Sequence, residues 1–495
     1  MARVFQSARS FMKSSSRALP YDAAGDGPRS RDWGTDHGPN TALLGSLEKL
    51  RKRARHEVRT NTWAASGVEV IVSNVVGSGI NPMHKNPALL ALWREWSTEC
   101  DAYHYTDFPG LQTLAMRAVV EGGEAFVRIR PRRMSDGLKV PFQLQVLEPE
   151  MVPSTLNKKL PNGNRIVAGI EHNLVGKPVA YHMLKSHPGE GSLLGDHNME
   201  TVRVPAEGVL HLRLMRRPGE VRGEPWLTKA LVRLKELSEY DDAELVRKRT
   251  AALYAGFIHT AGAEDDDDVV AGLNPELSSD AEDVVIDPLE PGSMITLPPG
   301  YDVKFSQPVD VGGTYEAFMR SQLRSIASAL GITYEQLTGD LGGVNDRLIR
   351  ASLLEFKRRA RSWQSDMMIH QLCRPVWRSF IEFARLAGEI SDSTDGVDIP
   401  PSWIPESWEH LHPAQDISAL EAEVRAGFKA RSEVIRQRGR DPEAVDELIA
   451  QDNARAERLG LMHSSDGRYD KMPDLPQDDD QDDDPQEDTD NADTD

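Results

Sequence analysis

Three long helical patterns limit what this chain can fold into. Apolar residues recur at steps of three and four along residues 226–257, 315–330 and 346–386. The first pattern corresponds to a helix of roughly 48 Å, which is long for a globular domain. Pro225 stands where a helix start tolerates proline. Pro375 lies inside the third pattern, where it removes a backbone hydrogen bond, so we expect a kink there.

The remaining segments mix helical and strand patterns. Apolar residues on one face predict further helices at residues 41–62, 87–121 and 415–461. Alternation of polar and apolar residues predicts strands at residues 124–130, 142–147, 167–171, 179–184 and 209–214. Two short strands are expected within residues 292–305. The predicted fold class is therefore α+β.

The net charge of −20 is divided into zones along the chain. Residues 474–495 contain twelve acidic and no basic residues, and residues 261–291 contain eleven acidic and no basic residues. Residues 1–60 carry twelve Lys or Arg against six Asp or Glu, and the rest is close to neutral with local basic clusters. We expect an extended or disordered N-terminal arm, a disordered acidic tail, and surfaces that meet different partners.

Motifs for catalysis, cofactors and metals are absent from the sequence. There is no Walker A loop, no glycine-rich dinucleotide turn, no HExxH and no GxSxG. Cys100 and Cys373 have no His or Cys neighbour at zinc spacing, and we expect both to be buried in a reducing compartment. No window approaches the roughly 20 apolar residues of a membrane helix, and no secretory signal is visible at the N-terminus. We therefore predict no enzyme activity, no cofactor, no metal site and no membrane partner.

Basic clusters are the residues that could contact phosphates. They lie at residues 51–59, 229–235, 247–249 and 357–361. Non-specific binding to a duplex requires positive charge and no base-reading motif, and zinc-finger, bZIP and RRM signatures are absent. For each cluster the alternative is a solvated or salt-bridged helix face.

Several short segments follow one another in a recognisable order. The most distinctive is RPGEVRGEPW at residues 217–226. The others are RTNTWA (59–64), NVVGSGINP (74–82), LEPE (147–150), GIE (169–171), PVAYH (178–182), HPG (187–189), LHL (210–212), IA (326–327), LGI (330–332) and YEQLTGD (334–340). Their order and spacing, over roughly residues 40–450, resemble the lambda-type family of tailed-phage portal proteins. The chain departs from the family pattern at residues 341–346, which read LGGVND where the family has a Ser/Asn-rich stretch.

The resemblance implies a portal fold with a mixed α/β wing, a two-helix stem, a small β-containing clip, a long kinked helix and a helical crown. The implied boundaries are a flexible arm (1–40), wing (41–225), first stem helix (226–260), clip (261–312), second stem helix (313–337), channel loop (338–347), kinked wing helix (348–403), crown (404–463) and disordered acidic tail (464–495).

The resemblance also implies a function. Twelve copies would form a ring at one capsid vertex of the virion, assembled in the bacterial host cytoplasm, through which double-stranded DNA is packaged and ejected without sequence preference. The implied partners are the terminase large subunit, major capsid and scaffolding proteins, and head–tail connector proteins.

Candidate site residues follow from placing the charged clusters on this layout. We expect the DNA channel to be lined by Lys229, Arg233, Lys235, Asn345, Arg347, Arg350, Lys357, Arg358, Arg359 and Arg361. We expect the packaging motor to dock on Glu264, Asp265, Asp266, Asp267 and Asp268.

Two other functions stay open. A packaging adaptor could bind DNA through residues 51–59, but it would not explain the long helices. A nuclease subunit would need a carboxylate metal cluster, which the sequence does not display.

Overall fold

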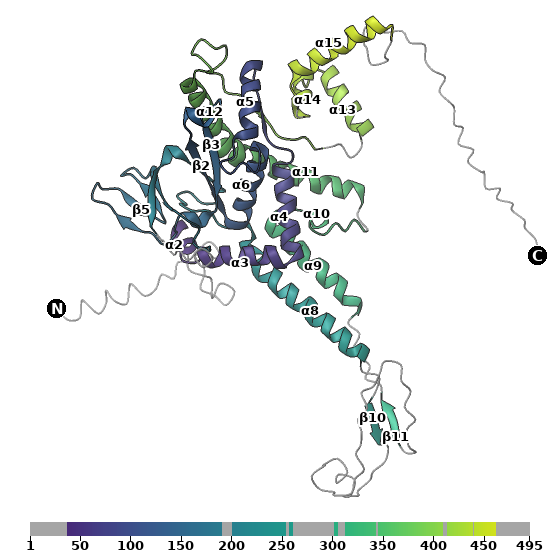
Figure 1. Ribbon diagram of the computed structural model, residues 1–495. Helices are drawn as coiled ribbons and strands as arrows, with labels where there is room; N and C mark the ends of the chain where they lie inside the picture. The colour runs from purple at the N-terminus through teal and green to yellow at the C-terminus, as the bar shows by residue number, and fades with distance from the viewer. Residues whose placement is uncertain are drawn as a thin grey trace, which may run out of the picture. The chain divides into compact units, whose positions relative to one another are not determined.

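The computed structural model describes residues 37–190, 200–253, 257–260, 301–304, 312–342, 345–408, 413–438 and 440–461 (Figure 1). The chain divides into two compact units, Met1–Pro405 and Glu406–Asp495. Within the described ranges, no helix is both long and apolar enough to cross a membrane. The predicted arm, up to residue 36, and the predicted acidic tail lie outside these ranges.

From residue 37 on, where the description begins, five helices form the N-terminal part of the first unit. They are α2 (Pro39–Leu44), α3 (Leu47–Thr60), α4 (Thr62–Val75), α5 (Pro87–Glu99) and α6 (Phe108–Gly122). The prediction of one helix at 87–121 was wrong, because Asp107 caps a new helix by accepting a hydrogen bond from Gly110 N–H. The predicted helix 41–62 is likewise divided, and Asn61 begins α4 by accepting from the backbone N–H groups of Trp63 and Ala64.

Two antiparallel sheets follow these helices. A three-stranded sheet has the order β3 (Phe142–Leu147), β2 (Glu124–Pro131) and β9 (Val209–Arg213). A five-stranded meander consists of β4 (Lys158–Lys159), β5 (Arg165–Val167), β6 (Ile170–His172), β7 (Pro178–Leu184) and β8 (Thr201–Pro205). The predicted strand 167–171 was wrong, because Ala168 and Gly169 both have positive φ and turn the chain between β5 and β6. Strand β8 was not predicted.

Two cores hold this unit together. Between the sheets, Phe126, Ile170 and Tyr181 pack in one buried apolar cluster. A second, aromatic cluster joins α5 to α12 (Arg374–Ala387), with Trp93 lying 5.2 Å from both Trp377 and Phe380 by ring centroids. The short pair β1 (Asn81–Met83) and β12 (Ser402–Ile404) closes this side. Cys100 and Cys373 are both buried free thiols, as predicted.

Two long helices flank a pair of short antiparallel strands in the sequence. The turn η5 (Trp226–Lys229) precedes α8 (Leu231–Leu253), and α9 (Gly312–Leu330) lies beside α8 (Figure 1). Strands β10 (Phe257–Thr260) and β11 (Tyr301–Lys304) pair antiparallel. The prediction that helix 226–257 extends to residue 257 was therefore wrong at its end. Of the two strands expected within 292–305, residues 301–304 form β11, and residues 292–300 lie outside the described ranges.

The third long helix is continuous but changes its hydrogen-bonding pattern. After α10 (Tyr334–Thr338), α11 (Asp346–Trp363) runs into the π-helix η7 (Gln364–Cys373) and then α12. The N–H of Arg374 donates to the carbonyl of Ile369, five residues back. Pro375, which has no N–H to donate, lies in the first turn of α12, two residues after the π-helix ends. The kink expected there stays a prediction.

Three helices make up the described part of the second unit: α13 (Pro413–Arg425), α14 (Arg431–Gln437) and α15 (Pro442–Leu459). They confirm the helical prediction for 415–461. Among the described residues of this unit, only Pro442 and Ala456 are buried. The remaining short turns are the 3₁₀ helices η2 (Met134–Asp136), η3 (Pro149–Met151) and η4 (Ala206–Gly208).

Candidate DNA channel surface

Aromatic contacts join α8 to the first part of α9. Tyr240 on α8 packs 4.9 Å from Phe318 and 6.0 Å from Tyr315 on α9, measured between ring centroids. The Tyr315 hydroxyl donates to the carboxylate of Asp241, and this hydrogen bond to the neutral phenol raises the pKa of Tyr315 to about 12. The two helices are therefore fixed to each other by side chains on one flank.

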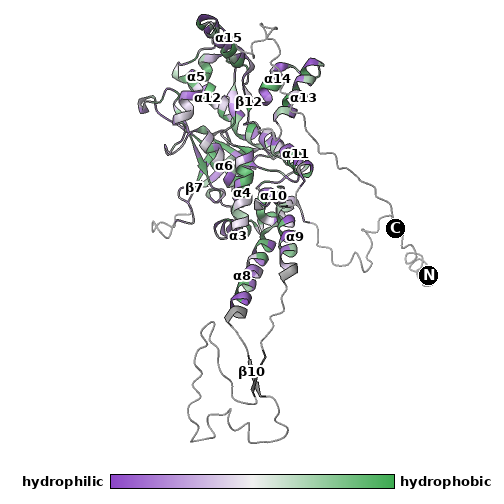
Figure 2. Cartoon of the chain, turned by 90° about the vertical axis from the view of Figure 1, so that its right-hand side faces the viewer, coloured by the Kyte–Doolittle hydropathy of each residue, from purple (hydrophilic) through white to green (hydrophobic). Residues whose placement is uncertain are grey.

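Charge along α8 is balanced. The helix contains five acidic and five basic residues, and Figure 2 shows hydrophilic and hydrophobic residues alternating along it. The predicted channel residues Lys229, Arg233 and Lys235 are exposed at its base. Lys235 lies 3.4 Å from Glu239, and Arg233 donates to the Gln322 amide of α9. Of these three side chains, only Lys235 has a carboxylate partner within the helix, which reduces its contribution to a positive surface.

The loop after α10 is anchored at Asp340 by hydrogen bonds. The Asp340 carboxylate accepts hydrogen bonds from the Gly342 N–H at 2.9 Å and the Tyr334 hydroxyl at 2.9 Å, and these lower its pKa. Below it, Ser66 of α4 donates to the Leu337 carbonyl at 2.8 Å. Residues 343–344 lie outside the described ranges. The loop therefore leaves a rigid base that α4 supports.

Asn345 and the basic residues of α11 do not all lie on one face of the helix. The Asn345 side chain caps α11 by accepting a hydrogen bond from the Arg347 N–H at 3.0 Å. At 100° per residue, Arg347, Arg358 and Arg361 lie within about 60° of one another on the helix. All three are exposed. Arg358 also lies 2.7 Å from Glu355, one turn before it.

The other α11 candidates diverge from this stripe. Arg350 and Lys357 are half-buried on its flank. The Arg359 guanidinium donates to the carbonyl of Gly331, at the end of α9, so it joins two helices and faces away from the stripe. The predicted docking residues Glu264 to Asp268 lie outside the described residues.

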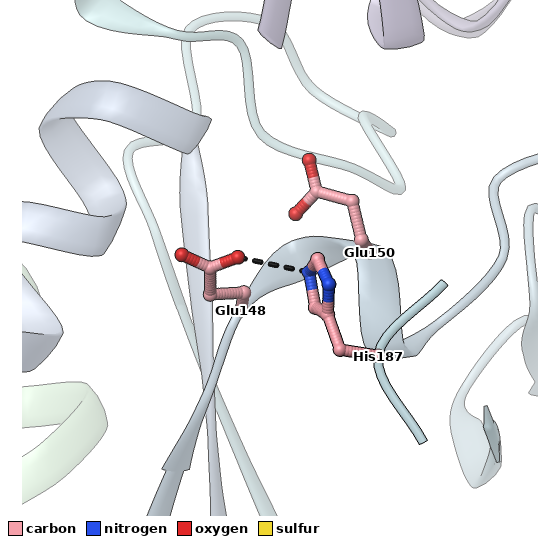
Figure 3. Close-up of side chains that lie close together, drawn as sticks. All are labelled: Glu148, Glu150 and His187. Carbon is pink, nitrogen blue, oxygen red and sulfur yellow. Dashed lines mark ion pairs between the residues drawn. The ribbon is translucent and has the colours of Figure 1, made fainter. Parts of the chain in front are cut away.

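One group of potential metal ligands occurs among the described residues (Figure 3). Glu148 and Glu150 follow β3, and His187 follows β7, with ligand atoms within 4.8 Å of one another. Nε2 of His187 lies 2.9 Å from the Glu148 carboxylate. Both oxygens of Glu150 accept hydrogen bonds from the Arg55 guanidinium at 2.7 and 2.8 Å, and Arg55 lies 3.4 Å from Glu148. Because a side-chain cation already neutralises these carboxylates, the group does not favour a metal.

A sequence model of the family described as phage portal protein, lambda family, matches residues 26–364, more than half of the chain. The chain belongs to this family of portal proteins. A probable portal protein of Halomonas phage phiHAP-1 is 28% identical over 457 residues, which cover 88% of this chain and 84% of the relative. Portal protein B of Escherichia phage lambda is 22% identical over 373 residues, covering 67% and 68%. A chain in the neck of a native gene transfer agent particle, computed with C12 symmetry, covers 81% of this chain and 95% of its own length at 15% identity and a TM-score of 0.46.

Membership confirms the resemblance and the α+β portal fold predicted from the sequence, and with them the role of a portal protein. The family is structural. The boundaries of wing, stem, clip and crown, and the channel-lining residues, stay predictions.

The most distinctive sequence segment of the portal protein, 217–226, begins at the surface and forms a buried junction at Arg222 and Gly223. Nε of Arg222 donates to Oε1 of Glu124 at 2.6 Å, and the Gly223 N–H donates to Oε2 at 2.9 Å. The remaining guanidinium nitrogens of Arg222 donate to the carbonyls of Pro149, Val152 and Ala168. One side chain therefore ties β2, η3 and the β5–β6 turn to the segment that leads into α8.

The same junction removes Arg51 and Arg55 from the basic stretch 51–59, whereas Lys52, Arg53 and Arg59 are exposed and stay candidates for phosphate contact. Arg51 is buried, and it donates to Glu124 at 2.5 Å and to the carbonyl of Gly122 at 2.8 Å. Arg55 is bound to Glu150, as described above. Helical spacing placed these arginines on the face of α3 that packs against the protein, and no signal in a single sequence identified their carboxylate partners.

Proposed function

We propose that twelve copies of this portal protein form a closed ring around a channel that passes double-stranded DNA at one capsid vertex of the virion. The observation that supports a ring is the exposed apolar surface of the α8–α9 pair. Val232 and Val246 of α8 are 65% and 59% exposed, and Phe318 of α9 is 43% exposed. Two helices bury only the flanks they share, and head-to-tail contacts between neighbouring pairs bury the others.

The charge distribution supports passage rather than retention of DNA. Affinity for a duplex rises with the number of phosphates that a surface neutralises. The balanced charge of α8 provides few such contacts, and the stripe of Arg347, Arg358 and Arg361 provides a small number. A channel built from these surfaces attracts DNA and still lets it slide.

The proposed partners follow from the same role. They are the terminase large subunit during packaging, major capsid and scaffolding proteins during assembly, and head–tail connector proteins afterwards. We propose assembly in the cytoplasm of the bacterial host, docking of the motor on the acidic run Glu264 to Asp268, and no catalytic step by this chain. A packaging adaptor and a nuclease subunit are the alternatives that the experiments below test.

Electron microscopy of the purified full-length chain tests the ring. We expect closed twelvefold rings for the native protein and for the control Val175→Asp, whose side chain lies in the β6–β7 turn. We expect Val232→Asp with Val246→Asp to abolish rings, because it places charge in the contact between neighbouring helix pairs. A monomer at high concentration, or rings in the double variant, contradicts the proposal.

The channel residues need a separate measurement. We expect the triple variant Arg347→Gln, Arg358→Gln, Arg361→Gln to form rings but to package DNA more slowly with purified motor and capsids. Unchanged packaging contradicts the assignment of this stripe to the channel. Divalent-metal-dependent DNA cleavage that persists through purification, and is lost in Glu150→Gln, would instead support the nuclease.

A further inference from the structure

A row of arginines lies on the three-stranded sheet, away from the α8–α9 pair. Arg128, Arg130 and Arg132 alternate along β2 and its extension, with Val127 and Ile129 buried on the opposite face. Side chains on one face of a strand repeat every two residues, so the charges are spaced about 7 Å apart. All three arginines are half-buried, so the sheet fixes their stems while their charged ends reach the surface.

Neutral side chains, not carboxylates, support Arg130 and Arg132. Nε of Arg130 donates to Gln145 at 2.8 Å, and Nε of Arg132 donates to Gln143 at 2.7 Å. No described carboxylate lies within ion-pair distance of the three guanidiniums. Burial, followed by the positive charges of Arg128 and Arg132, lowers the pKa of Arg130. The row is therefore a fixed positive surface without an internal counterion in the described chain.

Two tyrosines adjoin the row. Tyr103 and Tyr105 stack with centroids 6.2 Å apart and planes at 17°, and they are 53% and 89% exposed. The loop that carries them is fixed because Asp101 accepts hydrogen bonds from the backbone N–H groups of both residues. The Tyr103 hydroxyl accepts from the Gln145 amide at 2.5 Å, which connects it through that side chain to Arg130.

The edges of the sheet exclude one common form of peptide recognition. The edge of β3 that does not pair with β2 is covered at Leu144. The Leu144 N–H donates to the carbonyl of Cys100 at 2.7 Å, and the Leu144 carbonyl accepts from the Ala102 N–H at 2.8 Å. The edge of β9 is closed at Arg213, whose N–H and carbonyl both bond to the Gln371 side chain of η7. An added peptide strand therefore finds no free backbone groups at these positions. The surface instead offers regularly spaced charges and exposed aromatic faces.

We propose that the arginine–tyrosine surface, formed by Tyr103, Tyr105, Arg128, Arg130 and Arg132, binds a single strand of nucleic acid without sequence preference. The arginines contact the phosphates, which repeat once per nucleotide, and the tyrosine rings stack on unpaired bases. A basic track beside aromatic platforms is the chemistry by which single strands are held. The surface is separate from the proposed channel, so the inference does not depend on the ring.

Fluorescence anisotropy with the full-length protein tests the proposal. The probe is a labelled oligothymidine of about 20 nucleotides, long enough to cover one such surface. For Arg128→Gln, Arg130→Gln, Arg132→Gln we expect at least tenfold weaker binding at low salt. We also expect the slope of log affinity against log salt to fall by about 2, since each single-strand phosphate contact contributes about 0.7.

Three controls separate this surface from others. The matched variant Arg94→Gln, Arg374→Gln, Arg378→Gln loses the same charge from exposed positions elsewhere and is expected to keep the native slope. Tyr105→Ala is expected to weaken the single strand about tenfold and a duplex of the same length much less. Thermal melting confirms that each variant is folded.

Two outcomes would overturn the proposal. If the two triple variants lose the same binding affinity, binding depends on the net charge of the protein and not on the arginines of β2. If a polyglutamate peptide binds the native protein but not the β2 triple, while oligothymidine binds both equally, the partner is an acidic peptide.

Discussion

Arg222 and Glu124 are 98 residues apart in the sequence, yet Nε of Arg222 lies 2.6 Å from Oε1 of Glu124, with both side chains fully excluded from solvent. Arg51 and His211 complete the coordination of this carboxylate, at 2.5 and 2.7 Å. Burial alone raises the pKa of Glu124, but the opposite charges of Arg222 and Arg51 hold it well below its usual range. The carboxylate is therefore the charge on which this junction depends.

Replacing Glu124 by Gln should destabilise the protein strongly. The change leaves two guanidiniums buried without a counter-charge, and breaking a buried pair in this way costs about 3–5 kcal/mol. Chemical unfolding measures the loss. Glu69→Gln, which removes the partially exposed pair with Arg117, is the control and should cost less than about 1 kcal/mol. Equal losses in the two variants would contradict a special role for the buried junction.

The junction should also make stability depend on pH. Burial lowers the pKa of His211 to about 4, although the hydrogen bond and charge of Glu124 oppose this shift. Below its usual value near 6.5, the unfolded chain binds a proton that the folded protein does not. The free energy of unfolding should therefore fall by about 3 kcal/mol as pH decreases from about 6.5 to 4, at 1.36 kcal/mol per unit.

The variant His211→Gln tests this dependence. It keeps an N–H donor for Glu124 but removes the titrating ring, so its unfolding free energy should change less between pH 6.5 and 4.5 than that of the native protein. Urea unfolding at several pH values within this window measures the difference. Parallel pH profiles for both proteins would show that His211 does not titrate as stated.

Gly223 should tolerate no side chain. A Cβ at this position would lie 2.1 Å from the carbonyl oxygen of Gly123, a backbone atom that cannot move aside locally. We expect Gly223→Ala to cost more than about 2 kcal/mol or to prevent soluble expression. Gly219→Ala is the control in the same segment, because its φ of 83° is strained but its Cβ meets no atom within 4 Å. Its cost should be about 1 kcal/mol, and a larger loss than that of Gly223→Ala would contradict the explanation.

Asn345 should act first as a helix cap. Removing the cap in Asn345→Ala should destabilise the start of α11 by about 1 kcal/mol, whereas Asn345→Ser should retain most of it. Amide hydrogen exchange along residues 346–350 reports the change. If packaging slows equally in both variants while exchange is unchanged in Asn345→Ser, Asn345 contacts DNA directly rather than through the helix it begins.

The long helices were predictable because their information is local. Steps of three and four placed α9, α11 and α12 to within a few residues, but they gave no sign of the π-helix η7 between α11 and α12. The predicted elements were wrong where a single capping residue or a positive φ angle changed the course of the backbone. Asp107 caps α6 within a predicted continuous helix, and positive φ at Ala168 and Gly169 splits a predicted strand.

For the basic clusters, the sequence could not predict which side chains are buried and which are exposed. Periodicity identified residues 51–59 and 357–361 as equally charged helix segments. The structure buries Arg51 on Glu124 and turns Arg359 toward Gly331, while Arg358 and Arg361 remain exposed. Nothing in the sequence singles out the arginine row on β2, because its significance depends on the neighbouring tyrosines and on the absence of nearby carboxylates among the described residues.

The sequence by itself determined the family, the α+β class, the long helices and the zoned charge, because these depend on residue order and on interactions between near neighbours. Only the tertiary structure decided which charges are internal and which are presented to a partner. The physical reason is that the fate of an arginine depends on the carboxylate or carbonyl that packing brings to it. Glu124 reaches Arg222 across 98 residues, a distance over which no local pattern carries information.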